Sequence, residues 1–154
     1  MYATTLYDSI YEIPRLPDVI ELIRPQLGSH RSGNEPDEIR ASLSAALRPG
    51  SRAWMIVLTV EATGEPVGFA FFNVCSGLET DGDYIWLNEI FVSETERGRG
   101  GGKRILEHLQ DWAARRSAKA VYGICGKENT ASHAFYRRLG FDTAEAVWIS
   151  REVR

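Results

Sequence analysis

The chain has 154 residues, 44% of them hydrophobic, a length and composition that suit one globular domain with its own core. A formal net charge of −3 gives no general reason to expect a nucleic-acid partner, and two cysteines are too few for a disulfide scaffold or a metal site. The first ten residues lack a signal-peptide pattern, and no apolar run is long enough to cross a bilayer. We therefore predict a single, reduced, cytoplasmic domain over residues 1–154, with no metal and no membrane partner.

The first half of the chain is predicted to open with a strand, pass through two helices and return to strands. The predicted strands are residues 2–7, 54–60 and 67–74, and the predicted helices are residues 18–27 and about 37–47. Asp18 is the candidate N-cap of the first helix. Turn-forming residues fill the loop at 28–36 between the two helices.

Residues 84–112 are the most informative stretch, because they combine a strand, a glycine-rich turn and an amphipathic helix. Residues 84–92 are rich in aromatic and β-branched side chains, as in a central strand, and apolar residues recur at helical spacing from Ile105. N–H groups at a helix N-terminus attract anions, so the turn is predicted to bind a phosphate. Its glycines are Gly98, Gly100, Gly101 and Gly102, and its basic residues are Arg97, Arg99, Lys103 and Arg104.

The spacing of these glycines excludes two common phosphate loops. A nucleotide P-loop requires Lys followed by Ser or Thr, but Lys103 is followed by Arg104. A dinucleotide-binding loop requires G-x-G-x-x-G, and the last position is Lys103 or Ile105 in the two available registers. An arginine–glycine tract that binds RNA is a third alternative, although such tracts are usually repetitive and disordered.

The same stretch resembles the acetyl-CoA signature of the GNAT superfamily of N-acyltransferases, (Q/R)-x-x-G-x-(G/A), with Arg97, Gly100 and Gly102 in its three defined positions. The preceding LNEIFV, residues 87–92, resembles the fourth strand of that family. ENTASHAFYRRLGF, residues 128–141, resembles its later segment N-x-x-(A/S)-x-x-x-Y-x-x-x-G-F. One departure is Gly101, where the family usually has an aliphatic residue, and a glycine there is expected to loosen the loop.

The resemblance implies an α/β fold of the GNAT type, with a mixed, mostly antiparallel central sheet, a splayed parallel strand pair and flanking helices. The parallel pair would be residues 84–92 and 120–125, because a helix connects them. A helix at 130–139 and a strand-like ending within 142–153 would follow. The two early helices would form one wall of the acceptor pocket, and the loop at 28–36 would either influence acceptor selectivity or serve as a plain connector.

The resemblance also implies acetyl-CoA as cosubstrate, bound without a metal. The pantetheine arm would pair with backbone groups of the splayed strand, and the pyrophosphate would accept hydrogen bonds from the glycine turn. Asn129 matches a cofactor-contacting asparagine of the family, although its position before Thr130 also suits a helix cap. The predicted cofactor-binding residues are Ile90, Phe91, Val92, Arg97, Gly98, Arg99, Gly100, Gly101, Gly102, Lys103, Asn129 and Tyr136.

Two residues are candidates for acid–base catalysis. On a regular strand Glu89 shares a row with Ile85, Leu87 and Phe91, so a carboxylate interrupts an apolar face and burial would make it a better base. The alternatives, less favoured than the base role, are that Glu89 pairs with an arginine or binds the ammonium of the acceptor. Tyr136 matches the tyrosine of the second motif and is the candidate general acid, with packing of its ring as the alternative.

Weaker predictions concern five other residues. Glu79, Asp81 and Asp83 lie in the connection at 76–83, where they either attract a cationic acceptor or solvate a hairpin tip. Cys125 as an acyl-enzyme nucleophile and His133 as a proton relay are less favoured than a buried small side chain and a surface histidine.

From these observations we predict an N-acetyltransferase that moves an acetyl group from acetyl-CoA directly to the primary amine of a small molecule. The motifs look most like those of members that act on small amines, including polyamines. The alternatives are acetylation of a protein or peptide amine, and a CoA-binding sensor without turnover. The apolar residues 147–149 either complete the sheet or support a homodimer.

Overall fold

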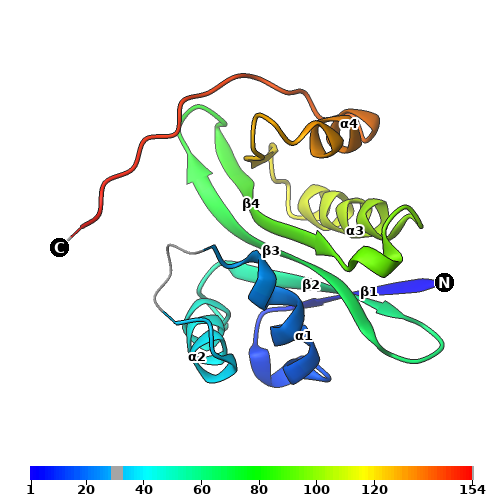
Figure 1. Cartoon of the computed structure of the whole chain (residues 1–154). Helices are drawn as coiled ribbons and strands as arrows, with labels where there is room; N and C mark the ends of the chain where they lie inside the picture. Colours follow the sequence, from blue (N-terminus) through cyan, green and yellow to red (C-terminus); the bar gives the residue numbers. More distant parts are fainter. Residues whose placement is uncertain (29–32, 154) are drawn as a thin grey trace. The chain divides into compact units, whose positions relative to one another are not determined.

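In the computed structural model, five strands of the described residues form one sheet (Figure 1). The structure describes residues 1–28 and 33–153 and divides into two compact units, residues 1–123 and residues 124–154. β1 to β4 are antiparallel, and β5 is parallel to β4 because a helix returns the chain between them. This confirms the predicted mixed α/β fold. The strands, in their order across the sheet, are β1 (Tyr2–Tyr7), β2 (Ala53–Val60), β3 (Pro66–Gly77), β4 (Gly82–Val92) and β5 (Val121–Gly123).

The helices of the first unit cover both faces of this sheet, α1 and α2 on one face and α3 on the other (Figure 1). The α-helices are α1 (Leu16–Ile23), α2 (Pro36–Ala46), α3 (Gly101–Arg115) and, in the second unit, α4 (Thr130–Arg138). In the predicted selectivity loop at 28–36, residues 29–32 lie outside the described residues.

The first helix begins earlier than predicted, and Asp18 does not cap it. Its N-cap is Arg15, which has a left-handed φ of 53° and no capping side-chain hydrogen bond. Pro17 lies in the first turn, where its fixed φ favours a helix start ahead of Asp18. The Asp18 carboxylate instead pairs with Arg15, with 2.7 Å between Nε and Oδ2.

Each face of the sheet has its own apolar core. On the α1/α2 face, Met55, Val57 and Phe69 join the buried residues of both helices, and Phe71 and Phe91 pack against this cluster. On the α3 face, the Trp112 ring lies 5.0 Å from Trp54 and 5.3 Å from Phe72, measured between ring centroids. The α3 residues Ile105, Leu106 and Leu109 are completely buried.

A β-bulge in β4 determines which of its side chains share a face. Leu87 pairs with Phe72 and Glu89 pairs with Phe71 on β3, so Asn88 is an extra residue without a ladder partner. Cross-strand partners lie on the same face of a sheet. Glu89 therefore lies with Phe71 on the α1/α2 face.

The bulge corrects one sequence prediction. Ile85 and Leu87 pair with Val74 and Phe72, on the α3 face, whereas Glu89 lies on the α1/α2 face. The predicted row of Ile85, Leu87 and Glu89 is therefore wrong, because one inserted residue exchanges the faces of every position after it.

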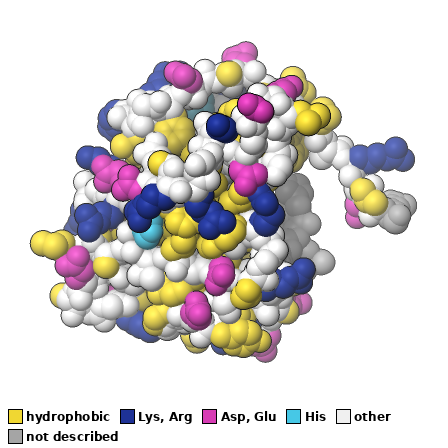
Figure 2. Space-filling view, turned by 180° about the vertical axis from the view of Figure 1, so that it is seen from behind, with side chains coloured by type: hydrophobic (Ala, Val, Ile, Leu, Met, Phe, Trp, Pro, Cys, Tyr) yellow, Lys and Arg dark blue, Asp and Glu magenta, His cyan; other side chains and the backbone are white. Residues whose placement is uncertain are grey.

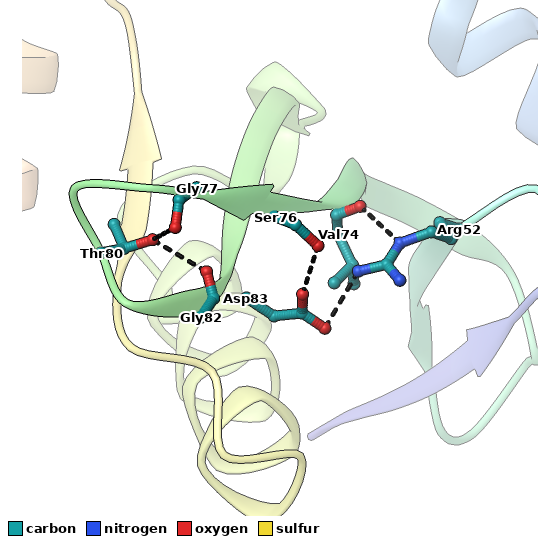
Figure 3. Close-up of polar contacts among 7 residues, drawn as sticks. All are labelled: Arg52, Val74, Ser76, Gly77, Thr80, Gly82 and Asp83. Carbon is teal, nitrogen blue, oxygen red and sulfur yellow. Dashed lines mark hydrogen bonds and ion pairs between the residues drawn. The ribbon is translucent and has the colours of Figure 1, made fainter.

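The acidic connection between β3 and β4 is fixed by a structural ion pair (Figure 3). Asp83 accepts a hydrogen bond of 2.7 Å from the Ser76 hydroxyl and lies 2.9 Å from Arg52 Nη2, while Arg52 Nε donates to the Val74 carbonyl at 3.0 Å. The Ser76 hydrogen bond and Arg52 together lower the pKa of Asp83. Asp83 thus has a structural role, and attraction of a cationic acceptor stays a prediction for the exposed Glu79 and Asp81.

Residues 142–153 form no strand, so the predicted strand-like ending is wrong. Val147, Trp148 and Ile149 remain 88%, 70% and 86% exposed. Their β-branched and aromatic composition favours a strand, but residues 124–153, the described part of the second unit, contain α4 and no strand that could pair with them.

Candidate active site

The turn between β4 and α3 presents a run of unpaired backbone N–H groups. Gly98 and Gly100 have left-handed φ values of 75° and 86°, and Gly100 is the N-cap of α3. The N–H groups of residues 98–103 have no acceptor among the described residues. A Cβ atom built at Gly98 or Gly100 would meet no atom within 4 Å, so the space above the turn is open. With the positive end of the α3 dipole, these groups make a concavity whose electrostatics favour an anion.

Arg97 connects this turn to the end of β4. Its Nε donates to the Val92 carbonyl at 3.0 Å, and its guanidinium lies 5.5 Å from the centre of the Phe91 ring. A third contact, of 3.9 Å, joins Arg97 to Glu94. The signature arginine therefore holds the glycine turn in place through its side chain.

Further basic residues border the turn, and Figure 2 shows Lys and Arg side chains gathered on the face where α3 lies. An open pocket of about 550 Å³ is lined by Tyr2, Glu96, Arg99, Gly100 and Arg104, among others. The Tyr2 hydroxyl donates to Glu96, which also lies 3.6 Å from Arg99. This link between β1 and the turn was not predicted, because nothing in the sequence indicates that residues 2 and 96 meet.

Gly101 allows close packing between α3 and the sheet. A Cβ atom at this position would lie 2.7 Å from Leu58 Cδ2, and the residue is buried. The missing side chain therefore lets the first turn of α3 approach β2. This packing role was not apparent from the sequence, which suggested only a looser loop.

β4 has an open backbone edge beside the glycine turn. β5 pairs with β4 only at Ile85, Trp86 and Leu87, while β3 pairs with the opposite edge as far as Val92. Among the described residues, no strand pairs with residues 88–92 on the β5 side. The predicted pantetheine partners Ile90, Phe91 and Val92 are on this stretch. Backbone groups that face such an open edge can bind an extended, amide-bearing chain, and the Val92 carbonyl already accepts a hydrogen bond from Arg97 Nε.

Glu89 lies half-buried on the α1/α2 face, next to its ladder partner Phe71. Its carboxylate makes no ion pair or hydrogen bond with the described residues, so no described arginine neutralises it. Burial raises the pKa of Glu89. A carboxylate in such surroundings is a stronger base than a solvated one.

Tyr136 and Asn129 belong to the second unit. Tyr136 lies on α4, and Asn129 is the residue just before this helix. Burial, and then the nearby Cys125, raise the pKa of Tyr136, which keeps its hydroxyl protonated at neutral pH. Its ring packs edge-on against Phe141, with centroids 5.4 Å apart. Asn129 caps α4, because its Oδ1 accepts a hydrogen bond of 3.1 Å from the Ser132 N–H.

The less favoured candidates have ordinary surroundings. The ring of His133 lies 3.0 Å from the Gly126 carbonyl, measured from Nε2, which holds the segment before α4 against the helix. Cys125 is a partly buried free thiol. No group of three side chains able to hold a metal ion occurs within residues 1–28 and 33–153, and no helix in that part is long and apolar enough to cross a membrane.

The structure thus brings Glu89, the open β4 edge and the glycine turn together in the first unit, and Asn129 with Tyr136 in the second. Sequence reasoning did not identify Asn88 as the residue that forms a bulge in β4. Two adjacent polar residues, Asn88 and Glu89, inside an apolar strand were the available signal, since strict alternation cannot place both on one face.

Known proteins give a consistent assignment. Residues 16–141 match the family described as "Acetyltransferase (GNAT) family". An uncharacterized N-acetyltransferase of Methanocaldococcus jannaschii is 36% identical over 56% of this chain and 39% of its own length. The D-amino-acid N-acetyltransferase HPA3 of Saccharomyces cerevisiae is 20% identical over 79% of this chain and 75% of its own length.

Solved structures agree on the fold. The aminoglycoside acetyltransferase meta-AAC0020, from an uncultured soil metagenomic sample, has a TM-score of 0.80 at 14% identity and covers 99% of this chain and 97% of its own. AAC(6')-Iy in complex with a CoA-containing bisubstrate analog has a TM-score of 0.77 at 19% identity, covering 100% and 99%. With the glycine turn, the open β4 edge and the matched sequence in agreement, the chain belongs to the GNAT acetyltransferase family.

Proposed function

We propose that this chain is an acetyl-CoA-dependent N-acetyltransferase that acts on the primary amine of a small molecule by direct transfer. The observation that carries the proposal is the open edge of β4 leading into the unpaired N–H groups of residues 98–103. An edge of this kind fits an extended chain with amides, and the N–H run fits a pyrophosphate, which together are the two halves of coenzyme A.

The residues present fit this cosubstrate without a metal. Backbone donors of residues 98–103 would hold the pyrophosphate, and backbone groups of Ile90, Phe91 and Val92 would hold the pantetheine arm. Such donors are fixed by the fold before binding, so they lose little entropy when the ligand arrives. Arg97 supports the turn through its hydrogen bond to the Val92 carbonyl. Asn129 is a further proposed contact of the cosubstrate.

Acetyl transfer forms a C–N bond, breaks the C–S bond of the thioester and moves one proton from nitrogen to sulfur. Glu89 is the proposed base, because its half-buried carboxylate has no described partner and a raised pKa. Tyr136 is the proposed acid, because it matches the tyrosine of the second motif and its partly buried hydroxyl is protonated at neutral pH. Asp83 is excluded from the base role by its ion pair with Arg52.

A small-molecule acceptor is supported by the relatives. A spermine/spermidine N(1)-acetyltransferase of Bacillus subtilis is 31% identical over 51% of this chain, and an aminoglycoside N(6')-acetyltransferase of Salmonella typhimurium is 28% identical over 59%. Both names describe amines of modest size. The exposed apolar residues 147–149 support association into a homodimer as an additional proposal.

Calorimetric titration with acetyl-CoA tests the proposal, with ATP and NAD as controls for general phosphate binding. We expect micromolar binding of acetyl-CoA alone, followed by thiol release when primary amines are added. Equal binding of all three ligands would indicate that the turn is a general anion site without specificity for coenzyme A. Binding of acetyl-CoA without thiol release from any amine would favour the sensor alternative.

A further inference from the structure

The bulge gathers polar and aromatic side chains on one part of the α1/α2 face. Asn73 is the ladder partner of Trp86, and Phe71, two residues before Asn73, is the partner of Glu89. The Nδ2 atom of Asn88 donates to Asn73 Oδ1 at 2.6 Å, which places the bulged side chain on the same face. We call Asn73, Trp86 and Asn88, next to Glu89, the amide–tryptophan patch.

The patch has hydrogen-bonding capacity that the protein does not use. The Asn73–Asn88 bond leaves the Asn88 Oδ1 and both N–H groups of the Asn73 side chain without a partner among the described residues. The Trp86 ring is partly exposed and stacks on no other aromatic ring of the described chain. An acceptor, a donor and an aromatic surface therefore lie beside the proposed base.

The number of carboxylates that β3 and β4 place on this face bears on the charge of the acceptor. In alternation with the ladder register, β3 places Phe69, Phe71, Asn73 and Cys75 here, and β4 places Tyr84, Trp86, Asn88, Glu89 and Phe91. Glu89 is the one carboxylate among them. A single anion matches a single ammonium, whereas a linear polyamine would leave its further charges against amides and rings, which compensate them poorly.

We propose that the amide–tryptophan patch binds the body of the acceptor, and that this acceptor is a monoamine carried on a hydroxylated ring, as in an amino sugar. The inference rests on the proposed acetyltransferase function. The ring hydroxyls would exchange hydrogen bonds with Asn73 and Asn88, one C–H face of the ring would lie on Trp86, and the amine would face Glu89. Each requirement corresponds to a group that the face presents.

Three amines distinguish this acceptor from others at equal acetyl-CoA concentration: glucosamine, cyclohexylamine and spermidine. Glucosamine carries one amine and several hydroxyls, cyclohexylamine has a ring without hydroxyls, and spermidine has several charges without a ring. We expect kcat/KM for glucosamine to exceed that of both others by at least about tenfold, the scale of one or two specific contacts.

Two substitutions test the patch itself. Trp86→Leu is expected to raise KM for glucosamine about tenfold and to leave KM for acetyl-CoA unchanged, as loss of a stacking surface requires. Asn73→Leu should abolish the preference for glucosamine over cyclohexylamine. Trp148→Leu, an exposed tryptophan outside the patch, is the matched control and should change neither constant.

The outcomes separate this inference from the function on which it rests. Preference for spermidine, or an unchanged KM for glucosamine in both patch variants, would overturn the acceptor assignment while acetyl transfer itself stood. Absence of both acetyl-CoA binding and turnover would overturn the proposed function, and the inference with it. Thermal melts of each variant confirm that KM is compared between folded proteins.

Discussion

A side chain at Gly100 should block the anion-binding turn at a cost in stability that can be measured separately. Gly100 has φ 86°, and its Cβ position meets no protein atom within 4 Å, so a methyl group there would project into the space proposed for the pyrophosphate. Gly50 has nearly the same φ, 83°, and an equally open Cβ position, but lies in the turn after α2. Gly50→Ala is therefore a matched control.

The stability cost should be similar for both variants. A left-handed conformation costs a non-glycine residue about 1–2 kcal/mol, and each kcal/mol lowers the melting temperature of a domain of this size by about 2–4 °C. The affinity for acetyl-CoA should differ between the two variants, because only Gly100→Ala would displace the pyrophosphate from the backbone N–H groups of the turn. Loss of one hydrogen bond to a charged group costs about 1.5–3 kcal/mol, or on the order of 10- to 100-fold in Kd.

The assay combines thermal melts with calorimetric titration of acetyl-CoA on the parent, Gly100→Ala and Gly50→Ala. We expect equal losses in melting temperature and a weakened Kd for Gly100→Ala alone. Parental affinity in Gly100→Ala, or the same affinity loss in both variants, would refute the assignment of the turn. Gly100→Val, with a larger branched side chain, should bind no acetyl-CoA.

Four other predictions, on three variants, concern groups that bind or release protons. Glu89→Gln should lose activity mainly at low and neutral pH, where the amine needs a base, and recover at high pH; a pH profile identical to that of the parent would remove Glu89 as base. Burial raises the pKa of Glu89, so ionising this carboxylate above its ordinary pKa destabilises the folded state. Glutamine does not ionise, so Glu89→Gln should be at least as stable as the parent at pH 7, as thermal melts would show. Tyr136→Phe should lower kcat by about 10²–10⁴-fold with little change in acetyl-CoA affinity, and unchanged turnover would leave Tyr136 a packing residue. Asp83→Asn should lower the melting temperature at pH 7, and the difference should disappear as pH falls through the lowered pKa of Asp83; a pH-independent difference would contradict the ion-pair explanation.

Local patterns in the sequence were sufficient for most of the fold. The central strand, the glycine turn and α3 follow from composition and periodicity over short windows, and Asn129 as a cap follows from residue type and position alone. The family resemblance and the mixed sheet were therefore predictable, and both are confirmed.

Features that depend on distant contacts were not predictable. The face of Glu89 depends on a bulge whose register is fixed by pairing with β3, and alternation along β4 alone gave the wrong row. The role of Asp83 depends on Arg52, which is thirty-one positions earlier and reaches it only once β2 and β3 are paired. A strand-like composition at 142–153 predicted a strand, but a strand requires a partner that composition does not supply.

The close approach of Gly101 to Leu58 implies that the side-chain sizes at these two positions change together during evolution. Where a relative has an aliphatic residue at the position of Gly101, its added methyl groups would overlap a leucine at the position of Leu58, since even a Cβ atom lies 2.7 Å from Cδ2 here. We expect such relatives to have a smaller side chain on the second strand, or a first helical turn displaced from the sheet. Gly101→Leu should thus be tolerated better together with Leu58→Ala than alone, an interaction that a double-mutant cycle would measure.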